Sequence, residues 1–547
     1  FVVDCGNQIP SSYFIARCYE LKTVSYARKV FDHFPDRSNA SLWNVMSKGY
    51  LRDEAFVDVI VLFRDMMRAE VKPNRYSLPL PLKSCCAIPG LKEGEQLHCL
   101  SVKNGFKSNV YVGTNLIDLY SGFAKVGCAH RVFTEMALRN VVSWTAMMDC
   151  YAANGDLLSA RSIFDVAPER DIVMWNRLFS SYIENGDLME SRRLFDMIPY
   201  KDVISYNTML NGYANNGDVA SCEKLFNSMK HRNIFSWNAL IAGYTHNGHF
   251  VEALHAFKTM LRDGDVPPND ATLVSVLTSC ARLAALDFGK SVHVYADDNG
   301  YGNNVFVCNG LIEMYAKCGC VNEALSVFRG MIGGKDQISW NTMINSLAVH
   351  GHAADALRLF DEMKCSGETP NGITFTGVLN ACSHMGLVED GLEYFRSMRE
   401  FSVEAKIEHY GCVVDLLARK GLLDQAVEFV DRMAIPPDGV IWTTLLAASR
   451  VHRRLELAEL CLRKLVEIDP ENPANYVMLS NVYGEARKWD GLARLKVASR
   501  DTGSKKQPGF SAVETEDGIV EFFASDKRHP KTEAIYDALG RLTELLR

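Results

Sequence analysis

Three consecutive stretches of this sequence repeat one pattern with no gap between them. They cover Val141 to Asn233, and their glycines Gly155, Gly186 and Gly217 lie 31 residues apart. Self-similarity at a fixed period is typical of a repeat array, in which each repeat packs only against its neighbours. A chain of 547 residues is too long for one compact core, and an array avoids that limit. Function is then best sought in the residues that vary at fixed places within the repeat.

Each repeat predicts two helices. The first helix holds apolar residues at helical spacing, as in Trp340, Met343, Ile344 and Leu347. A glycine near the middle of the repeat predicts the left-handed residue that ends this helix. These glycines are Gly155, Gly186, Gly217, Gly248, Gly319, Gly351, Gly386 and Gly421. Neither helix is long enough to be stable alone, so consecutive pairs have to stack to bury their apolar faces.

The chain changes character after Asp438. Two further helix pairs are expected there, similar to tetratricopeptide repeats. Runs rich in β-forming residues then flank Asp517-Gly518, a dipeptide suited to a tight hairpin. Lys531–Arg547 predicts a closing helix.

Composition excludes several classes of function. The net charge of −7 and the pI near 6.1 argue against a protein that coats polyanions in general, although a local basic groove stays open. The 16 cysteines contain no CxxC pair, so we expect them to pack in a reducing compartment, and we expect no metal site and no cofactor. No apolar run is long enough to cross a membrane. Because the chain begins at Phe1, we expect part of its N-terminus to be missing, and the lack of a targeting peptide is uninformative.

The array resembles the plant pentatricopeptide repeat family, specifically its subclass of alternating P, L and S motifs with E and E-plus extensions. The resemblance rests on Trp-Asn starts of the first helices, on lengths of 31, 35 and 36 residues, and on the order of the repeat kinds. Thirteen repeats fit from Ile9 to Asp438. The resemblance implies an all-α fold, a right-handed α-solenoid of helix-turn-helix repeats with tetratricopeptide-like E motifs and a small β-hairpin-containing tail. It divides the chain into a partial S-type repeat (1–39), the array (40–438), two E motifs (439–514) and an E-plus tail (515–547).

The family reads single-stranded RNA at one base per repeat, through the fifth and the last residue. A carboxylate at the last place can accept the ring N–H of guanine or uracil, and an amide there can donate to the bare ring nitrogen of adenine or cytosine. The pairs in this chain are Asn44 with Asn74, Thr114 with Asn140, Thr145 with Asp171, Asn176 with Asp202, Asn207 with Asn233, Asn238 with Asn269, Asn309 with Asp336, and Asn341 with Asn371.

These pairs predict an RNA target. Thr with Asn suggests A, Thr with Asp suggests G, Asn with Asp suggests U, and Asn with Asn suggests a pyrimidine (Y). The family places the RNA 5′ end toward the protein N-terminus, so Ala40–Asn371 predicts Y-n-A-G-U-Y-Y-n-U-Y. Pro79 and Val274 occupy the fifth place in the L-type repeats and leave those bases open, as do Thr376 with Lys406 and Gly411 with Asp438.

The resemblance also implies that the apolar second residue of a repeat wedges between bases. The residues concerned are Val142, Val173, Ile204, Phe235, Phe306 and Ile338. Packing at the helix edge is the alternative for these side chains. For an isolated Asn176 or Asn207, a helix cap is the alternative to base reading.

Tempting catalytic residues have simpler explanations. His98 and His293 occupy identical places in two L-type repeats, which favours a structural role. Cys85, Cys280 and Cys382 also share one place and would be spread along the array.

A nucleobase deaminase needs H-x-E and PCxxC, and neither motif occurs in the sequence. We therefore expect no enzyme activity. Related editing factors carry such a domain after the E-plus region, where this chain stops. Phe522–Pro530 resembles the E-plus sequence, but Ala512 replaces the usual tryptophan of PGxSW.

The leading hypothesis is a factor that selects sites for organellar C-to-U RNA editing and recruits a deaminase in trans. Its partners would be single-stranded organellar RNA and a deaminase-domain protein or other editing factors, with no membrane. The expected location is the mitochondrion, with the chloroplast as alternative. An RNA stabilisation, processing or splicing factor is the second hypothesis. A helical-repeat scaffold that binds proteins is the third.

Overall fold

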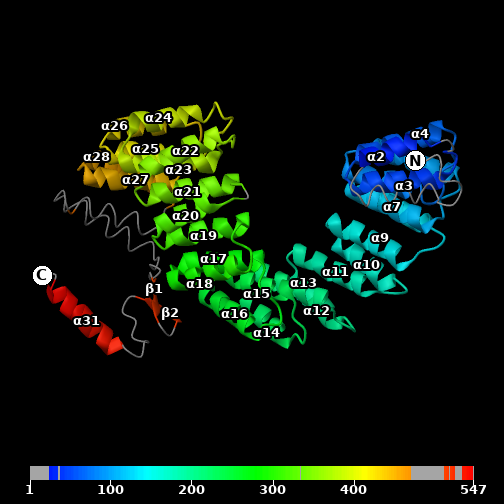
Figure 1. Ribbon diagram of the computed structural model, residues 1–547, viewed down its shortest axis with the longest axis horizontal. Helices are drawn as coiled ribbons and strands as arrows, with labels where there is room; N and C mark the ends of the chain where they lie inside the picture. The colour runs from blue at the N-terminus through cyan, green and yellow to red at the C-terminus, as the bar shows by residue number, and fades with distance from the viewer. Residues whose placement is uncertain are drawn as a thin grey trace. The chain divides into compact units, whose positions relative to one another are not determined.

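The computed structural model describes residues 24–34, 37–332, 334–469, 484, 510–515, 518–523 and 532–545. The described residues form a succession of short helices, followed by one hairpin and a last helix (Figure 1). The chain divides into two compact bodies, Phe1–Ala239 and Leu240–Arg547, which we call the N-terminal and the C-terminal body.

The N-terminal body holds six and a half helix pairs among its described residues. Its helices are α2 (Val24–Asp32), α3 (Ala40–Arg52), α4 (Phe56–Arg68), α5 (Pro79–Ala87), α6 (Leu91–Lys103), α7 (Val110–Gly122), α8 (Val126–Glu135), α9 (Val141–Ala153), α10 (Leu157–Val166), α11 (Ile172–Glu184), α12 (Leu188–Met197), α13 (Val203–Asn215) and α14 (Val219–Ser228). The division between the bodies falls within α15 (Ile234–His246).

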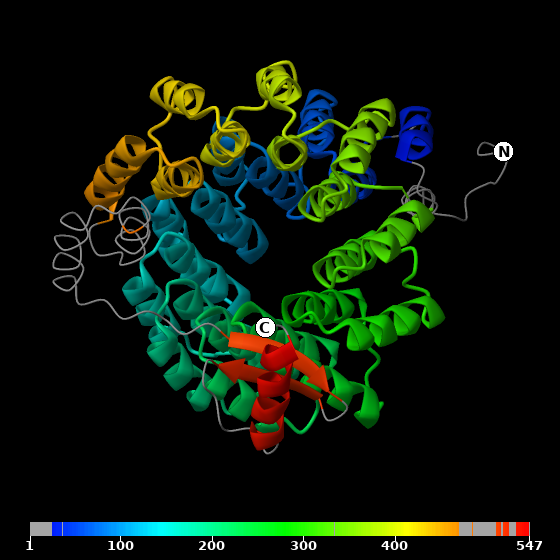
Figure 2. The ribbon, with the colours of Figure 1, turned by 90° about the vertical axis from the view of Figure 1, so that its left-hand side faces the viewer.

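The C-terminal body continues the same alternation of helices (Figure 2). Its elements are α16 (Phe250–Asp263), α17 (Asp270–Leu283), α18 (Leu286–Asp298), α19 (Val305–Lys317), α20 (Val321–Gly330), α21 (Gln337–Val349), α22 (Ala353–Cys365), α23 (Gly372–Met385), α24 (Val388–Ser397), α25 (Ile407–Arg419), α26 (Leu423–Asp431), α27 (Gly439–Val451), α28 (Leu455–Ile468), β1 (Phe510–Thr515), β2 (Gly518–Phe523) and α31 (Thr532–Leu545).

Within each body the first helices of consecutive repeats contact one another in a row. This row comprises α3, α5, α7, α9, α11 and α13 in one body, and α17, α19, α21, α23, α25 and α27 in the other. A second helix such as α22 contacts both its own first helix, α21, and the first helix of the next repeat, α23. Side chains at one place of the first helices therefore recur along a continuous row, as an α-solenoid requires.

Aromatic residues fill the core between repeats, as the Trp-Asn pattern predicts. Trp175 of α11 lies edge-on against Phe164 of the preceding second helix, with ring centroids 4.6 Å apart. The Arg170 guanidinium lies over the Phe164 ring, 5.1 Å from its centroid, and its Nε donates to the Phe164 carbonyl at 2.7 Å. Because its hydrogen bonds are made inside the repeat, this arginine closes the loop rather than facing the row of first helices.

The predicted glycines do end the first helices. All eight have positive φ, between 68° at Gly386 and 82° at Gly155 and Gly351. Only glycine reaches this region at no steric cost. Ala124 has φ 55° at the same place of a repeat that lacks the glycine, so this alanine carries a local strain.

One first helix starts later than its neighbours. In the L-type repeat that begins at Arg75, α5 starts at Pro79, whereas α7 and α9 start at the first residue of their repeats. Proline has no N–H and is tolerated only in the first helical turn, so the helix begins at this residue. Pro79 is thus the first helical residue of its repeat, although it stands at the fifth place of the sequence pattern.

The tail forms the predicted hairpin and closing helix. Strands β1 and β2 are antiparallel, with Phe510 opposite Phe523 and Thr515 opposite Gly518. Gly518 therefore opens β2, whereas the sequence suggested that it belonged to the turn, and residues 516 and 517 lie outside the described part. The second helix pair expected after Asp438, most of Phe522–Pro530 and residues 1–23 also lie outside it. None of the described helices is long and apolar enough to span a membrane.

Candidate nucleic-acid interface

The structure brings the fifth and the last residue of five repeats into contact. The Nδ2 atom of the fifth-place asparagine donates to Oδ1 of the last residue in each of them. The distances are 3.1 Å for Asn44 and Asn74, 3.4 Å for Asn176 and Asp202, 3.1 Å for Asn207 and Asn233, 3.2 Å for Asn309 and Asp336, and 3.1 Å for Asn341 and Asn371. The fifth and the last residue of one repeat, 26 to 30 residues apart in the chain, thus form one polar unit, which we call a reader pair.

The last residue of a repeat also caps the next first helix. Asp202 Oδ1 accepts from the backbone N–H of Ser205 at 2.7 Å, and Asn371 Oδ1 accepts from the N–H of Thr374 at 3.1 Å. The sequence raised capping as the alternative role of Asn176, but Asn176 is the fifth residue of α11 and its partner Asp202 is the cap.

Capping fixes which atom of the last residue remains available. A backbone N–H only donates, so the atom that faces it must be an oxygen. For an asparagine at this place the remaining atom is Nδ2, a donor, and for an aspartate it is Oδ2, an acceptor. An exchange of Asp for Asn therefore reverses the hydrogen-bonding character of the site without changing its shape.

A buried hydroxyl beneath the reader pair orients the fifth-place amide. Ser205 Oγ lies 2.7 Å from both Asn176 Oδ1 and Asp202 Oδ1, and Ser339 Oγ lies 2.7 Å from Asn309 Oδ1 and 2.8 Å from Asp336 Oδ1. Since these hydroxyls hold the amide oxygen, Nδ2 has to point toward the last residue, and its second hydrogen stays available to a ligand.

Sequence reasoning missed these hydroxyls, although their recurrence is visible. Each of the six predicted fifth-place asparagines is followed in the next repeat by a buried Ser or Thr at the third place, namely Ser77, Ser205, Ser236, Thr272, Ser339 and Thr374. The two L-type repeats with Pro79 or Val274 at the fifth place are followed by Val112 and Val307. Ser143, which follows Thr114, occupies the same buried place, so the hydroxyl occurs after every fifth-place asparagine but is not confined to asparagine repeats.

The aspartates of the reader pairs are held in the ionised form. Burial by itself raises the pKa of Asp202, but hydrogen bonds from the side chain and backbone of Ser205 and from Asn176 outweigh it, so the pKa lies below its ordinary value. The pKa of Asp336 is lowered in the same way by Ser339 and Asn309, against the effect of burial. At neutral pH both side chains only accept hydrogen bonds.

The threonine repeats are built differently. The hydroxyls of Thr114 and Thr145 donate to the carbonyls of Val110 and Val141 in their own helices, each at 2.9 Å. No hydrogen bond joins Thr114 to Asn140 or Thr145 to Asp171 in this part of the described chain. Asn140 and Asp171 cap α9 and α11, Asn238 is the fifth residue of α15, and Asn269 caps α17.

The second residues of the repeats project into solvent. The six predicted wedges, Val142, Val173, Ile204, Phe235, Phe306 and Ile338, are between 53% and 67% exposed. Such exposure leaves these side chains accessible to a ligand, and their wedging between bases stays a prediction. Tyr111, Ile373 and Val440 are exposed at the same place and were missed, although the repeat phase alone identifies them.

A cavity of about 330 Å³ shows how these places combine. Ile338 and Ile373, the second residues of two consecutive repeats, both line it, with the reader residue Asn341 between them in the chain. Lys317 from the preceding first helix adds a cation. Two apolar side chains, an amide and a cation suit a planar base that carries a phosphate.

The residues that resembled catalytic groups have structural roles. His98 Nδ1 lies 2.8 Å from the Tyr120 hydroxyl, and His293 Nδ1 lies 2.9 Å from that of Tyr315, so each histidine ties an L-type repeat to the next first helix. The three cysteines that share one place, Cys85, Cys280 and Cys382, are fully buried. Among the described residues no three His, Cys, Asp or Glu side chains are arranged to hold a metal ion.

Comparison with known proteins identifies the repeats. A model described as "PPR repeat" matches residues 41–71, 142–172, 173–203, 306–334, 373–403 and 408–434, and one described as "PPR repeat family" matches 201–235, 232–282 and 335–384. A model described as "E motif" matches residues 452–514.

Relatives in Arabidopsis thaliana match along almost the whole chain. One pentatricopeptide repeat-containing protein is 40% identical over 94% of this chain and 84% of its own length. A second, named as mitochondrial, is 36% identical and covers 95% of this chain and 67% of its own length. A third, named as chloroplastic, is 39% identical and covers 96% of this chain and 76% of its own length.

A solved structure shares the fold. The maize pentatricopeptide repeat protein PPR10, in complex with an 18-nt psaJ RNA element, has a TM-score of 0.59 at 15% identity and covers 92% of this chain and 81% of its own. With sequence relatives at 40% identity and repeat models matched along the array, this chain belongs to the pentatricopeptide repeat family.

Proposed function

We propose that this chain is a sequence-specific single-stranded RNA-binding factor. The observation that carries the proposal is the recurrence of one polar unit along the first helices: five reader pairs, each with its asparagine amide directed at the last residue of the repeat. The RNA complex of PPR10 supports RNA as the ligand. A scaffold that binds proteins has no need of a pair that alternates between Asp and Asn at an otherwise constant place.

Each reader pair offers one base a defined set of hydrogen bonds. A last-place Asp336 accepts the ring N–H of uracil or guanine, whereas a last-place Asn371 donates to the ring nitrogen of cytosine or adenine. Exposed second residues stack on both faces of the base, and groove cations such as Lys317 neutralise phosphate. The repeats from Ala40 to Asn371 therefore read Y-n-A-G-U-Y-Y-n-U-Y from the 5′ end.

Fluorescence anisotropy with a labelled oligonucleotide of that sequence tests this reading. The proposal predicts that the target binds at least about tenfold more tightly than a scrambled RNA of equal composition, because several base-edge contacts are lost together. Equal affinities for the two RNAs would refute the assignment. Both measurements need the same salt concentration, since phosphate contacts depend on salt.

The biological role that we propose is the choice of sites for organellar C-to-U editing, with the deaminase supplied by another protein. The E motif match and the relatives named as mitochondrial and chloroplastic support an organellar editing factor, and the mitochondrion is our proposed location. Comparing editing of organellar transcripts in plants with and without the protein tests this role. A lost editing site next to the predicted target supports it, whereas unchanged editing with altered transcript abundance or splicing would point to stabilisation or processing.

A further inference from the structure

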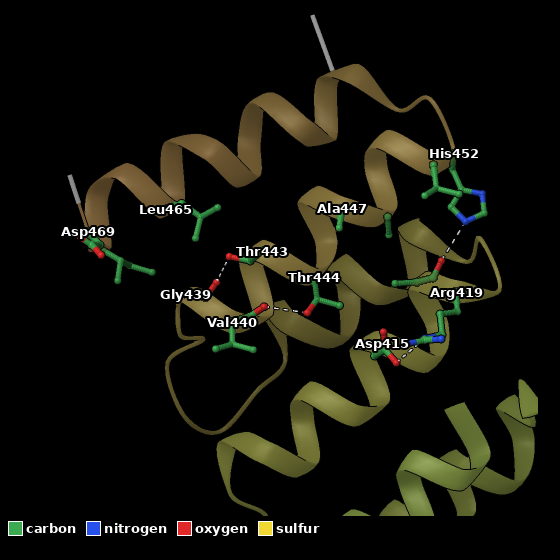
Figure 3. A pocket seen from close by; sticks show the side chains of 14 residues that line it. Asp415, Arg419, Gly439, Val440, Thr443, Thr444, Ala447, His452, Leu465 and Asp469 are labelled. Atoms are coloured by element: carbon green, nitrogen blue, oxygen red, sulfur yellow. Dashed lines mark hydrogen bonds and ion pairs between the residues drawn. The ribbon is translucent and has the colours of Figure 1, made fainter. Parts of the chain in front are cut away.

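The first helix pair after the array contains a second groove. It has a volume of about 820 Å³ and is lined by the first helices α25 and α27 and by the end of α28. In Figure 3, Leu465 and Asp469 lie at one end of the groove, Arg419 and His452 lie at the other, and Val440, Thr444 and Ala447 of α27 lie between them.

This groove repeats the lining of the cavity beside Asn341. Ten of the residues that line the smaller cavity have a counterpart 102 residues later in the chain, and each counterpart lines the larger groove. Ile338 corresponds to Val440, Asn341 to Thr443, and Lys317 to Arg419. The places that form the proposed base subsite in the array thus recur, in the same phase, in a helix pair outside it.

The substitutions at these places keep the chemistry of a base subsite. Val440, at the second place, is apolar and 68% exposed, like the wedges of the array. Thr443 at the fifth place donates to the Gly439 carbonyl at 2.7 Å, as Thr145 donates to the Val141 carbonyl at 2.9 Å. Arg419 supplies a cation on the same side as Lys317 does, although it is paired with Asp415 at 2.7 Å.

Asp469 supplies an acceptor. It is exposed, lines the groove, and follows Thr443 by 26 residues, the separation of Thr145 and Asp171. The backbone before Asp469 differs from that before Asp171. Helix α28 has 14 residues and ends directly before Asp469, whereas α10 has 10 residues and a loop connects it to Asp171. The pair Thr443 and Asp469 therefore repeats the residue types of a guanine-reading repeat.

We propose that α27 and α28 form a further nucleotide subsite, for a base that carries a ring N–H, guanine or uracil. The proposal rests on the proposed RNA-binding function and extends it. The subsite reads the base three nucleotides 3′ of the one at Gln337–Asn371, because two repeats lie between them. Val440 stacks on the base, Asp469 accepts its ring N–H, and Arg419 contacts phosphate.

The test uses the full chain and four labelled RNAs, 5′-UAAGUCUAUCAAX-3′, with X as each of the four bases. The RNAs ending in G or U should bind about fivefold to tenfold more tightly than those ending in A or C. Asp469→Asn should reverse this preference, and because Asp469 is exposed the change leaves the fold intact. Val440→Ser should weaken binding of all four RNAs by about fivefold, through lost stacking.

A fifth RNA separates failure of the subsite from failure of the proposed function. It replaces the internal G, read by Thr145 and Asp171, with C. If this RNA binds more weakly but the identity of X has no effect, the subsite is refuted and RNA reading by the array stands. The same result is expected if another part of the chain fills the groove between α25, α27 and α28. If neither the internal base nor X affects binding, both proposals fail.

Discussion

Removal of one buried hydroxyl should erase base discrimination at a single nucleotide. Ser339 is fully buried, and its Oγ lies 2.7 Å from Asn309 Oδ1. In Ser339→Ala, Asp336 Oδ1 keeps its bonds from the Ser339 backbone N–H at 2.8 Å and from Asn309 Nδ2 at 3.2 Å, so the helix cap survives. Asn309 Oδ1 instead loses its donor.

The size of the effect follows from the lost bond. Leaving a buried acceptor without its partner costs about 1–2 kcal/mol. In the variant only the bond to Asp336 holds the Asn309 amide, so the N–H that faces the base no longer has a fixed direction. Preference for uracil at the nucleotide read by Asn309 and Asp336 should therefore fall by about fivefold to thirtyfold, the factor that corresponds to this energy.

The assay is anisotropy titration with the target RNA carrying each of the four bases at that nucleotide. Ser339→Thr is the matched control, because Thr272 and Thr374 hold the same place in other repeats. Circular dichroism melting checks that both variants fold. The reasoning is refuted if Ser339→Ala keeps the full uracil preference, or if Ser339→Thr loses as much of it as the alanine variant does.

Three further predictions concern single residues. Phe306→Ala should weaken binding of the target RNA by about fivefold to 150-fold with an unchanged melting temperature, since Phe306 is exposed and stacking on a base is worth about 1–3 kcal/mol; unchanged affinity in anisotropy would contradict this. Burial raises the pKa of Asp149 to about 6 in spite of Arg177, so its ionisation destabilises the fold as the pH rises from about 4 to about 6. Asp149→Asn should then stabilise the protein by about 1 kcal/mol at pH 7.5, a figure reduced because the side chain is 35% exposed, and by nothing near pH 4; melting curves at the two pH values decide. Ala124→Gly should stabilise and Gly155→Ala destabilise by about 1 kcal/mol each, because both sites have positive φ, and urea unfolding showing the same sign for both would exclude this explanation.

The sequence was most informative where one local pattern determines one local conformation. A glycine such as Gly217 was expected to be left-handed, and an aromatic such as Trp237 was expected to be buried, because each recurs in phase in most of the 31-residue repeats. The pairing of Asn176 with Asp202 came from the family resemblance, which implies that the fifth and the last residue of a repeat act together, and the two side chains do lie in contact.

What the sequence did not reveal depends on three-dimensional detail. The cap made by Asp202 and the hydroxyl of Ser205 decide which atoms face outward, and neither effect appears in a list of fifth and last residues. The late start of α5 depends on Pro79. It was missed because the repeat pattern numbers the residues of a repeat and does not show at which of them the helix begins. The approach of Asp469 to the groove depends on the length of α28.

The central claim is that the last residue of a repeat selects the base, and Asp171→Asn tests it most directly. Asn caps a helix as well as Asp does, so α11 and the stability of the protein should be unaffected. The measurement is the ratio of affinities for RNAs that carry G or A at the nucleotide read by Thr145 and Asp171. The account predicts that the wild-type protein favours G and that the variant favours A, each by about tenfold. A folded variant with an unchanged ratio would contradict it.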